Sequence, residues 1–516
     1  MSNVQCPMSQ EVQRLKKSNV QCPMSNVQCP MSNVCLVVTS LAPFSLSKLN
    51  RFALARQTLD IGHWTLDFLG TLDIKLLGTL DFELRRAYDV RSFLTPISKR
   101  DSDFPREIPM IEFELTDDHK ALVQTVREFA QKEVAPYIKE WDEKQETHPE
   151  ILKKMGELNL LGVCIPEQYG GAGFDYIALG LVCEELEAVD TFLRVVMSVH
   201  TGLNSLTLLT WGTEDQKQKY LVPQAKGEKL STYGLTEPGA GSDVVGSRST
   251  ARREGDEYVL NGEKMWISLA DLADNFLFFC WTDEEKRRKR DHSGMSCFIV
   301  ERTMKGFSSG TIHGKLGIRA GNTGYFSLQD VRVPKENLVG EEGEGFKIAM
   351  FALEQGRYTV ASGATGVIRA SRDASVAYAL ERETFGTKIA NHQLVKQKIA
   401  EMEADYRMSH LLWLHAGYLK NVGQANARAT SLAKWQATVR SEKAASMAIE
   451  VHGANGYSND YPVERYLRNC KAAIIYEGTR DIHTLMQADW ALGLKKEKPA
   501  RRTLPVWKPS GEPVSA

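Results

Sequence analysis

The spacing of apolar residues changes twice along the chain, and this restricts the fold to three successive parts. Residues 116–222 repeat apolar positions at helical intervals. From about residue 231, short apolar runs such as 276–281 and 325–333 have the length and composition of strands. Helical spacing then returns and persists over 346–492. The order predicts an α+β protein in which a β-domain separates two helical domains.

The length of the chain supports this division. Its 516 residues exceed the ~250–300 at which a single hydrophobic core stops growing. We expect five segments: a repetitive leader over 1–109, an N-terminal helical domain over 110–230, a middle β-domain over 231–338, a C-terminal helical domain over 339–495 and an extended tail over 496–516.

Local signals refine the outline. Thr116, followed by two acidic residues, predicts a helix start. Further helices are expected over 150–160, 176–189, 203–210 and 215–222. Asn261-Gly262 lies between two strand-like runs and predicts a two-residue hairpin turn. The charged run 284–290 is interpreted as a solvated hairpin tip, with a docking surface as the alternative.

The first 109 residues differ from the rest because they repeat themselves. Met-Ser-Asn-Val-Gln-Cys-Pro occurs at 1–7 and again at 24–30, and Thr-Leu-Asp begins at residues 58, 65, 71 and 79. So short and uneven a period fits no solenoid. We interpret this leader as low-complexity sequence without a packed fold. Metal binding by the repeated Cys-Pro and a targeting peptide are the alternatives.

Composition excludes several classes of function. The net charge of −1 offers no basic field for nucleic acid or an anionic membrane surface. No uncharged apolar run of about 18 residues suggests a membrane span. The cysteines beyond the leader form no C-x-x-C pair, so we expect reduced core thiols and no metal site.

Three segments carry the functional signal. They are Tyr233-Gly234-Leu235-Thr236-Glu237-Pro238-Gly239-Ala240-Gly241-Ser242-Asp243, then Met265-Trp266-Ile267-Ser268, and finally Ile475-Tyr476-Glu477-Gly478-Thr479. With the helical–β–helical order, they resemble the acyl-CoA dehydrogenase family over about 112–492. The resemblance implies a middle β-barrel-like domain and a C-terminal four-helix bundle. It also implies FAD as cofactor, an electron-transferring flavoprotein as electron acceptor, a homotetramer, and a cytoplasmic or, in a eukaryote, mitochondrial-matrix location.

Dehydrogenation of an acyl thioester needs a base for the α-proton and an acceptor for the β-hydrogen. No side chain accepts hydride, so a cofactor must, and in this family it is the flavin. By resemblance, Glu477 is the catalytic base, because burial would raise the pKa of its carboxyl toward working pH. Some relatives keep their base at a position that is Gly356 in this chain, where no base exists.

The resemblance also implies the binding residues. Cofactor contacts are expected from Tyr233, Leu235, Thr236, Gly241, Ser242, Trp266, Ile267, Ser268, Arg382, Phe385, Gln393, Glu450, Thr479 and Asp481. Substrate contacts are expected from Ser242, Glu354, Arg357, Arg194, Ser198, Tyr476 and Gly478. The segment from Arg382 to Gln393 resembles the one that reaches the neighbouring subunit's FAD. Two departures are Leu269-Ala270 for the usual Asn-Gly, and Glu450 where relatives often have Gln.

Arg194 bears on the choice of substrate. Most relatives have apolar or small residues here, whereas glutaryl-CoA dehydrogenases carry an Arg and, four positions later, a Ser that hold the distal carboxylate. Arg194 and Ser198 match this spacing, which places both on one helix face, and Glu187 matches an acid of the same network in that subfamily. Leu193, however, replaces the Tyr usual before the Arg. A plain short-chain or branched acyl group is preferred, with glutaryl-type oxidative decarboxylation as the alternative.

Two further hypotheses use the same fold. A flavin monooxygenase or oxidase would often lack the Tyr-Glu-Gly base that this chain retains. A scaffold without catalytic activity would show no turnover with any acyl-CoA, and replacing Glu477 would then change nothing. Oxygen reactivity of the reduced flavin and a Glu477→Gln variant distinguish these alternatives.

Overall fold

The computed structural model describes residues 114–497 and 502–507, together with the backbone of Arg56–Ile61 and Trp64–Leu69. The chain forms two compact units, Met1–Ile108 and Pro109–Ala516. In the first unit, β1 (Arg56–Ile61) and β2 (Trp64–Leu69) pair antiparallel, which sets two Thr-Leu-Asp repeats opposite each other. The prediction for the remainder of the leader lies outside the described residues.

The first part of the second unit is helical, as predicted. Its helices are α3 (Asp117–Phe129), α4 (Ile138–Lys144), α5 (Pro149–Glu157), α6 (Tyr176–Val189), α7 (Thr191–Val196), α8 (Leu206–Trp211), α9 (Glu214–Gln216) and α10 (Val222–Ala225). The first begins where expected, because Thr116 Oγ1 accepts a hydrogen bond from His119 N at 3.2 Å. The bounds of α6 coincide with the prediction.

The helix expected over 203–210 is part of a longer helical run. Thr191–Trp211 is continuous, with π-helical hydrogen bonding over Met197–Ser205 between α7 and α8. Among the described helices, this run has the length and composition to cross a membrane, but 94% of the apolar window is buried inside the protein. It packs against α12 and β3, so it is a core helix that carries side chains into the centre of the unit.

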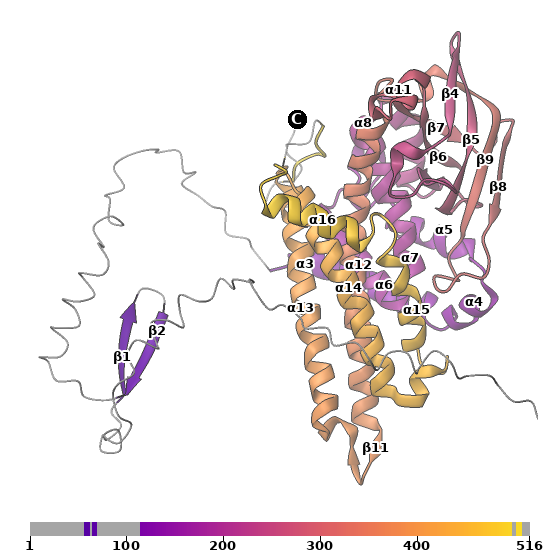
Figure 1. Cartoon of the computed structure of the whole chain (residues 1–516). Coiled ribbons are helices and arrows are strands. Elements are labelled where there is room, and N and C mark those ends of the chain that lie inside the picture. The colour runs from indigo at the N-terminus through magenta and orange to yellow at the C-terminus, as the bar shows by residue number, and fades with distance from the viewer. Residues whose placement is uncertain (1–55, 62–63, 70–113, 498–501, 508–516) are drawn as a thin grey trace, which may run out of the picture. The chain divides into compact units, whose positions relative to one another are not determined.

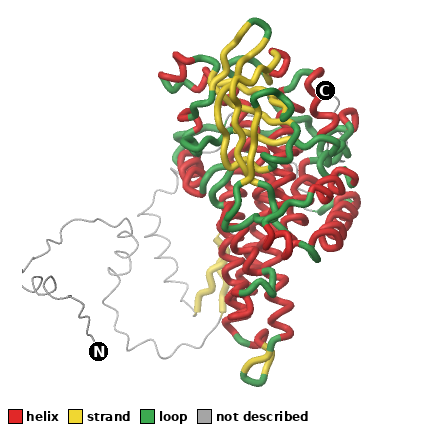
Figure 2. Tube along the Cα trace, turned by 90° about the vertical axis from the view of Figure 1, so that its right-hand side faces the viewer, coloured by secondary structure: helices red, strands yellow, loops and turns green. Residues whose placement is uncertain are grey.

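The middle part is a mixed sheet of eight strands within 231–339 (Figure 2). The strands are β3 (Ser231–Gly234), β4 (Thr250–Glu254), β5 (Glu257–Ser268), β6 (Asn275–Trp281), β7 (Met295–Glu301), β8 (Phe307–Thr311), β9 (Thr323–Pro334) and β10 (Leu338–Val339). Their order is β10-β7-β6-β4-β5-β9-β8, and β3 runs parallel to β6. Every residue of β6 is buried, so this strand lies in the core of the part.

The predicted hairpin turn at Asn261-Gly262 is wrong. These residues lie inside β5, where the register to β9 shifts between Leu260 and Gly262 as a β-bulge. The chain reverses earlier, between β4 and β5, where Glu254 pairs with Glu257. Gly262 is close to Ser249, since a Cβ there would lie 2.1 Å from Ser249 Oγ. An Asn-Gly pair therefore marks a close backbone approach here instead of a turn.

The charged run 284–290 connects β6 to β7 and contains the short helix α11 (Glu284–Arg288). Arg287, Arg288 and Lys289 pair with acids of the same segment, for example Lys289 with Glu285 at 2.6 Å, whereas Arg290 pairs with Asp243 at 2.6 Å. No residue of α11 is buried. The run is thus a solvated connection between adjacent antiparallel strands, as the preferred interpretation expected.

Long helices form the last part. They are α12 (Gly345–Glu381), α13 (Gln393–Asn421), α14 (Ala427–His452), α15 (Val463–Ala473) and α16 (Arg480–Ala491). Helices α12, α13 and α14 lie side by side in Figure 1, and the hairpin of β11 (Glu383–Thr384) and β12 (Thr387–Lys388) projects from their end away from the sheet. The predicted α+β class, with a β-domain between two helical parts, is confirmed.

Candidate active site

Two cavities share Glu477 in their walls. The first, here the Arg194 cavity, has a volume of about 590 Å³ and includes Arg194, Ser198 and Ser268 in its lining. The second, here the Lys495 cavity, has about 930 Å³ and includes Ser242, Glu354 and Lys495. Residues common to both linings are Leu235, Thr236, Trp266, Leu353, Ile475, Tyr476 and Glu477. A ligand that extends through both cavities would pass this carboxylate.

The two carboxylate oxygens of Glu477 differ in their surroundings. Oε1 accepts a hydrogen bond from Ser198 Oγ at 2.8 Å. Oε2 is buried and has no hydrogen-bond partner in the described part of the chain. Burial raises the pKa of Glu477, while the positive charge of Arg194 and the Ser198 hydrogen bond act in the opposite direction. One oxygen is therefore held in place, and the other is free to accept a proton.

Two basic side chains fix the backbone of this turn. Arg357 Nε donates to Glu477 O at 3.0 Å, and Lys434 Nζ donates to Gly478 O at 2.7 Å. The turn needs this support, because Glu477 has a φ of +54° and Gly478 a φ of +100°. Burial lowers the pKa of Lys434 to about 7, and the nearby Glu477 carboxylate opposes that shift.

The carbonyl groups at Glu477 and Gly478 are thus occupied, whereas their backbone N–H groups are not. Neither N–H has a hydrogen-bond acceptor among residues 114–497 and 502–507. Unpaired N–H groups beside a cavity are suited to an oxygen atom that gains negative charge. The turn therefore offers a base and a polarising donor within one or two residues of each other.

A second ionic group supports the first. Arg194 Nε donates to Glu187 Oε2 at 2.6 Å, and both side chains are 1% exposed. Arg194 also donates to the hydroxyl group of Tyr476, next to Glu477. Thr359 Oγ1 donates to Ser198 Oγ at 2.8 Å, so the serine is oriented as a donor to the carboxylate. The charge of the buried Arg194 is thus neutralised by Glu187.

Two glycines of α12 make room for these groups. A Cβ at Gly356 would lie 2.1 Å from Glu477 Oε2. A Cβ at Gly363, two helical turns later, would lie 1.9 Å from Glu187 Oε2. Any larger residue would displace the carboxylates, so α12 can approach both only because these positions lack side chains.

The predicted cofactor residues fall into two spatial groups. One group lines the cavities: Tyr233, Leu235, Thr236, Trp266, Ile267 and Ser268 the Arg194 cavity, and Gly241, Ser242 and Thr479 the Lys495 cavity. Trp266 is 58% exposed with a φ of +62°. The hydroxyls of Thr236 and Ser268 have no hydrogen-bond partner in the described residues. This group presents a flat aromatic surface with two free hydroxyls.

The other residues line neither cavity, although Asp481 adjoins Ile482, which lines the Lys495 cavity. Arg382, Phe385, Gln393 and Glu450 belong to the β11–β12 hairpin and the adjoining helices, and Asp481 is exposed on α16. Phe385 is 98% exposed with a φ of +53°, and Glu450 pairs with Lys398 at 2.9 Å. Within one chain, Arg382, Phe385, Gln393 and Glu450 do not join the site. The predicted substrate residues Arg194, Ser198, Ser242, Glu354, Arg357, Tyr476 and Gly478 all line one or both cavities.

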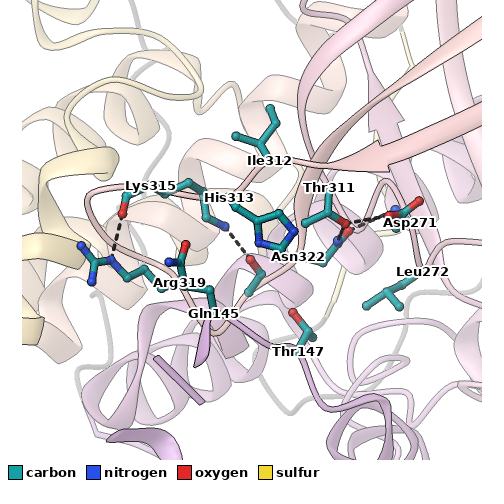
Figure 3. A pocket seen from close by; sticks show the side chains of 11 residues that line it. Gln145, Thr147, Asp271, Leu272, Thr311, Ile312, His313, Lys315, Arg319 and Asn322 are labelled. Carbon is teal, nitrogen blue, oxygen red and sulfur yellow. Dashed lines mark hydrogen bonds between the residues drawn. The ribbon is translucent and has the colours of Figure 1, made fainter. Parts of the chain in front are cut away.

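A third cavity of about 360 Å³ lies where the connection from α4 to α5 meets the loop after β8 (Figure 3). Gln145 Oε1 accepts from Gly314 N at 2.7 Å, and Thr147 Oγ1 donates to Ala320 O at 2.8 Å. Lys315 lines this cavity and the Arg194 cavity, and burial lowers its pKa to about 8. The contacts fix the loop that forms one wall of the Arg194 cavity.

Two predicted features concern metal and sulfur. No group of three or more His, Cys, Asp or Glu residues within the described ranges is arranged to hold a metal ion. The described cysteines are all buried and free: Cys164, Cys183, Cys280, Cys297 and Cys470. Burial raises the pKa of these thiols, so they are poor nucleophiles. Their burial also makes them core residues.

Comparison with known proteins agrees with this geometry. Family models for the N-terminal, middle and C-terminal domains of acyl-CoA dehydrogenases match residues 116–228, 232–331 and 343–492, respectively. The chain belongs to the acyl-CoA dehydrogenase family. Members of this family are oxidoreductases that act on acyl-CoA, so the resemblance inferred from the motifs is confirmed.

Individual acyl-CoA dehydrogenases cover nearly all of the described unit. A short-chain specific acyl-CoA dehydrogenase from Clostridium acetobutylicum is 40% identical over 376 residues, which are 73% of this chain and 98% of that protein. Butyryl-CoA dehydrogenase from Megasphaera elsdenii superposes with a TM-score of 0.72 at 34% identity, covering 74% and 100% of the two chains. A glutaryl-coenzyme A dehydrogenase in complex with glutaryl-CoA gives 0.73 at 34% identity, covering 76% and 99%.

Several residues that support this acyl-CoA dehydrogenase site lie outside the sequence motifs. Lys434 and Thr359 belong to helices whose sequences are typical of packed core helices. Lys434 nevertheless donates a hydrogen bond to Gly478 O, and Thr359 donates one to Ser198 Oγ. A lysine on the small-residue face of α14 was the available signal, since Ala433 and Ala437 beside it are fully buried. Residues 494–497 also line the Lys495 cavity. The sequence predicts 494 and 495 at the end of the C-terminal helical domain and 496 and 497 at the start of the tail.

Proposed function

We propose that this chain oxidises short acyl-CoA thioesters between Cα and Cβ to the trans-2-enoyl-CoA, with Glu477 as the base for the α-proton. The observation that carries the proposal is the single half-hydrogen-bonded carboxylate where the two cavities meet. The acyl group would enter the Arg194 cavity, and the CoA part would lie in the Lys495 cavity.

The residues at the Arg194 cavity fit FAD. Trp266 offers an exposed ring face, and Thr236 and Ser268 offer unpaired hydroxyls for the polar edge of a flavin. FAD bound there would supply the acceptor for the β-hydrogen as hydride. Tyr233 would contribute by packing, because its own hydroxyl already donates to Ala349 O at 3.2 Å.

The protein's own groups account for removal of the α-proton. Glu477 Oε2, which has no hydrogen-bond partner among the described residues, is the oxygen available to take it. The backbone N–H of Glu477 would bind the thioester oxygen and stabilise the charge that develops there. Arg357 and Lys434 keep that N–H in position by holding the carbonyls of the turn. The enclosed carboxylate, with its raised pKa, is a stronger base than an exposed one.

The distal group of residues supports an oligomer. Phe385 is almost fully exposed at the tip of a hairpin in a left-handed conformation, which is unfavourable for an isolated aromatic residue. We propose that Arg382, Phe385 and Gln393 reach the FAD of a neighbouring subunit in a homotetramer. Glu450, paired with Lys398, is a weaker partner for a phosphate. Passage of electrons to an electron-transferring flavoprotein and a cytoplasmic or matrix location are part of the same proposal.

A second candidate substrate is a dicarboxylic thioester of the glutaryl type. Arg194 and Ser198 line the same cavity, as that substrate would require. Both are already engaged, however: Arg194 pairs with Glu187, and Ser198 donates to Glu477. The pairing with Glu187 is itself compatible with a glutaryl-type site. We prefer a plain short acyl chain because Leu193 replaces the Tyr usual before the Arg and because short-chain specific enzymes are among the similar proteins.

One experiment tests both candidates. The purified protein should be yellow, and butyryl-CoA added without oxygen should bleach the visible absorbance of the flavin. Isobutyryl- and glutaryl-CoA are compared at equal concentrations. Bleaching by glutaryl-CoA alone would reverse the order of the two candidates, and bleaching by none of the three would contradict the proposal. Rapid reoxidation by oxygen would favour an oxidase.

Replacement of Ser198 by alanine should change the pH dependence of turnover. Its hydrogen bond favours the ionised form of Glu477, so its loss raises the pKa of that carboxyl. A hydrogen bond to a charged group contributes about 1.5–3 kcal/mol, and one pH unit corresponds to about 1.4 kcal/mol. The acid limb of the kcat/KM profile should therefore move up by about one to two pH units. Ser205→Ala, on the same helical run, should leave the limb in place, and an unmoved limb in Ser198→Ala would contradict this role.

Alanine at Gly356 should disturb the base directly. The new Cβ would lie 2.1 Å from Glu477 Oε2 and 2.7 Å from Leu203 Cδ2, so the carboxylate must move. A displacement of about 1 Å lowers turnover by about 10²-fold. Measured kcat should fall by that order while flavin content is retained. Gly202→Ala is the control, because its Cβ would meet its nearest neighbour, Thr359 Cγ2, at an ordinary 3.5 Å.

A further inference from the structure

The chain continues past the end of the family model for the C-terminal domain. The family model for the C-terminal domain ends at residue 492. Residues 493–507, here the C-terminal segment, follow α16, and the structure describes 493–497 and 502–507 of them. This segment contributes to the architecture of the second unit, although the family match does not include it.

The far end of the C-terminal segment is anchored in the protein. Trp507 is 2% exposed and Leu504 is 9% exposed. Trp507 N donates to Asn421 O at 2.7 Å, and Tyr176 hydroxyl donates to Pro505 O at 2.9 Å. A tryptophan buried in this way contributes a large apolar contact area. Residues 502–507 are therefore bound to the end of α13 and the start of α6.

The near end of the segment forms part of the Lys495 cavity. Leu494, Lys495, Lys496 and Glu497 all line it. Glu497 Oε1 accepts from Arg428 N at 2.9 Å, in the first turn of α14. Lys495 Nζ lies 4.8 Å from the centre of the Trp490 ring. These contacts hold residues 495–497 against the mouth of the cavity that also contains Glu354 and Ser242.

Some charged side chains of this cavity already have partners among the described residues, and others do not. Its cations are Arg357, Lys495 and Lys496, and its acids are Glu354, Glu477 and Glu497. Arg357 supports the turn of Glu477, and Glu497 caps α14. Burial raises the pKa of Glu354, which disfavours its charge. Within the described residues, Lys496 has no ion pair. The two lysines of the segment are thus the cations left to meet an anionic ligand.

We propose that Lys495 and Lys496 of the C-terminal segment bind the phosphate groups of the CoA moiety. The inference rests on the proposed function, which directs the thioester to Glu477 and the CoA part into the Lys495 cavity. Phosphates attract lysine as a point charge, and an ammonium group on a flexible chain reaches them without a fixed geometry. The buried Trp507 anchor limits how far the two lysines move from the cavity.

The test compares a substrate that carries the phosphorylated nucleotide of CoA with one that lacks it. In the full-length protein, Lys495→Gln/Lys496→Gln should raise KM for butyryl-CoA by about tenfold, because each exposed charge pair contributes up to about 1 kcal/mol. For butyryl-pantetheine, which lacks the nucleotide and its phosphates, KM of the double variant should differ from the wild-type KM by less than about twofold. Added salt should raise the wild-type KM for butyryl-CoA more than that of the variant.

Controls separate this inference from the proposed function. Lys153→Gln/Lys154→Gln, an adjacent lysine pair on α5 that lines neither cavity, should leave both KM values unchanged. Failure of wild-type protein to turn over either substrate would contradict the proposed function. Wild-type turnover with an unchanged KM for butyryl-CoA in Lys495→Gln/Lys496→Gln, or with equal increases for both substrates, would overturn only the phosphate contact. Trp507→Ala supplies a second variant, in which release of the anchor should raise KM for butyryl-CoA and not for butyryl-pantetheine.

Discussion

Glu477→Gln is expected to lower kcat by about 10²–10⁴-fold while the protein remains yellow and folded. Glutamine keeps the size of the side chain and still accepts the hydrogen bond that Ser198 donates at 2.8 Å. It cannot take the α-proton, because an amide is not a base at working pH. Stopped-flow bleaching of the flavin by butyryl-CoA measures this step, and the rate should fall as kcat does.

Glu354→Gln is the matched control for this prediction. Glu354 lines the Lys495 cavity, and burial raises the pKa of its carboxyl as it does for Glu477. Glu354 lies on α12, outside the turn that carries Glu477 and its unpaired Oε2. Its replacement should therefore change KM more than kcat. If Glu354→Gln abolished bleaching and Glu477→Gln did not, the base would have been assigned to the wrong carboxylate.

The sequence was informative where a local pattern determines a local structure. Apolar periodicity predicted α6 to its ends, because its buried residues and its Asp175 cap lie within one contiguous stretch. The same reasoning failed at Asn261-Gly262, where the dipeptide is a bulge in β5. A turn and a bulge both use residues that tolerate unusual backbone angles, so the partner strand β9 decides between them.

The candidate site shows the same limit. The motifs include Glu477 and some of the residues that line the two cavities, because these residues lie in short contiguous segments. Lys434 and Thr359 act through single contacts across 44 and 161 residues of sequence, which no spacing rule reveals. The role of Gly363 depends on how closely α12 approaches Glu187. By resemblance Glu187 belongs to the same network as Arg194, but only the structure shows that both side chains are buried and that the acid neutralises the arginine.

That neutralised arginine leads to the second large effect. Arg194→Leu is expected to destabilise the folded protein by about 3–5 kcal/mol, because it leaves the charge of Glu187 buried without a partner. Both side chains are 1% exposed, so water cannot take the place of the guanidinium. Urea denaturation of the FAD-loaded protein, followed by circular dichroism, measures the loss. A change below about 1 kcal/mol would contradict the buried ion pair.

The double variant and the pH dependence identify the cause. Glu187→Leu/Arg194→Leu removes both charges, and its stability should return close to that of the wild type, since apolar pairs often replace buried ion pairs without loss. Burial already raises the pKa of Glu187 with Arg194 present, and removing the arginine raises it further. A pKa higher in the folded state than in the unfolded state gives stability at low pH that is lost as pH rises. The deficit of Arg194→Leu should therefore shrink below the unfolded pKa of Glu187 and grow toward neutral pH, whereas a deficit caused only by lost packing would stay constant.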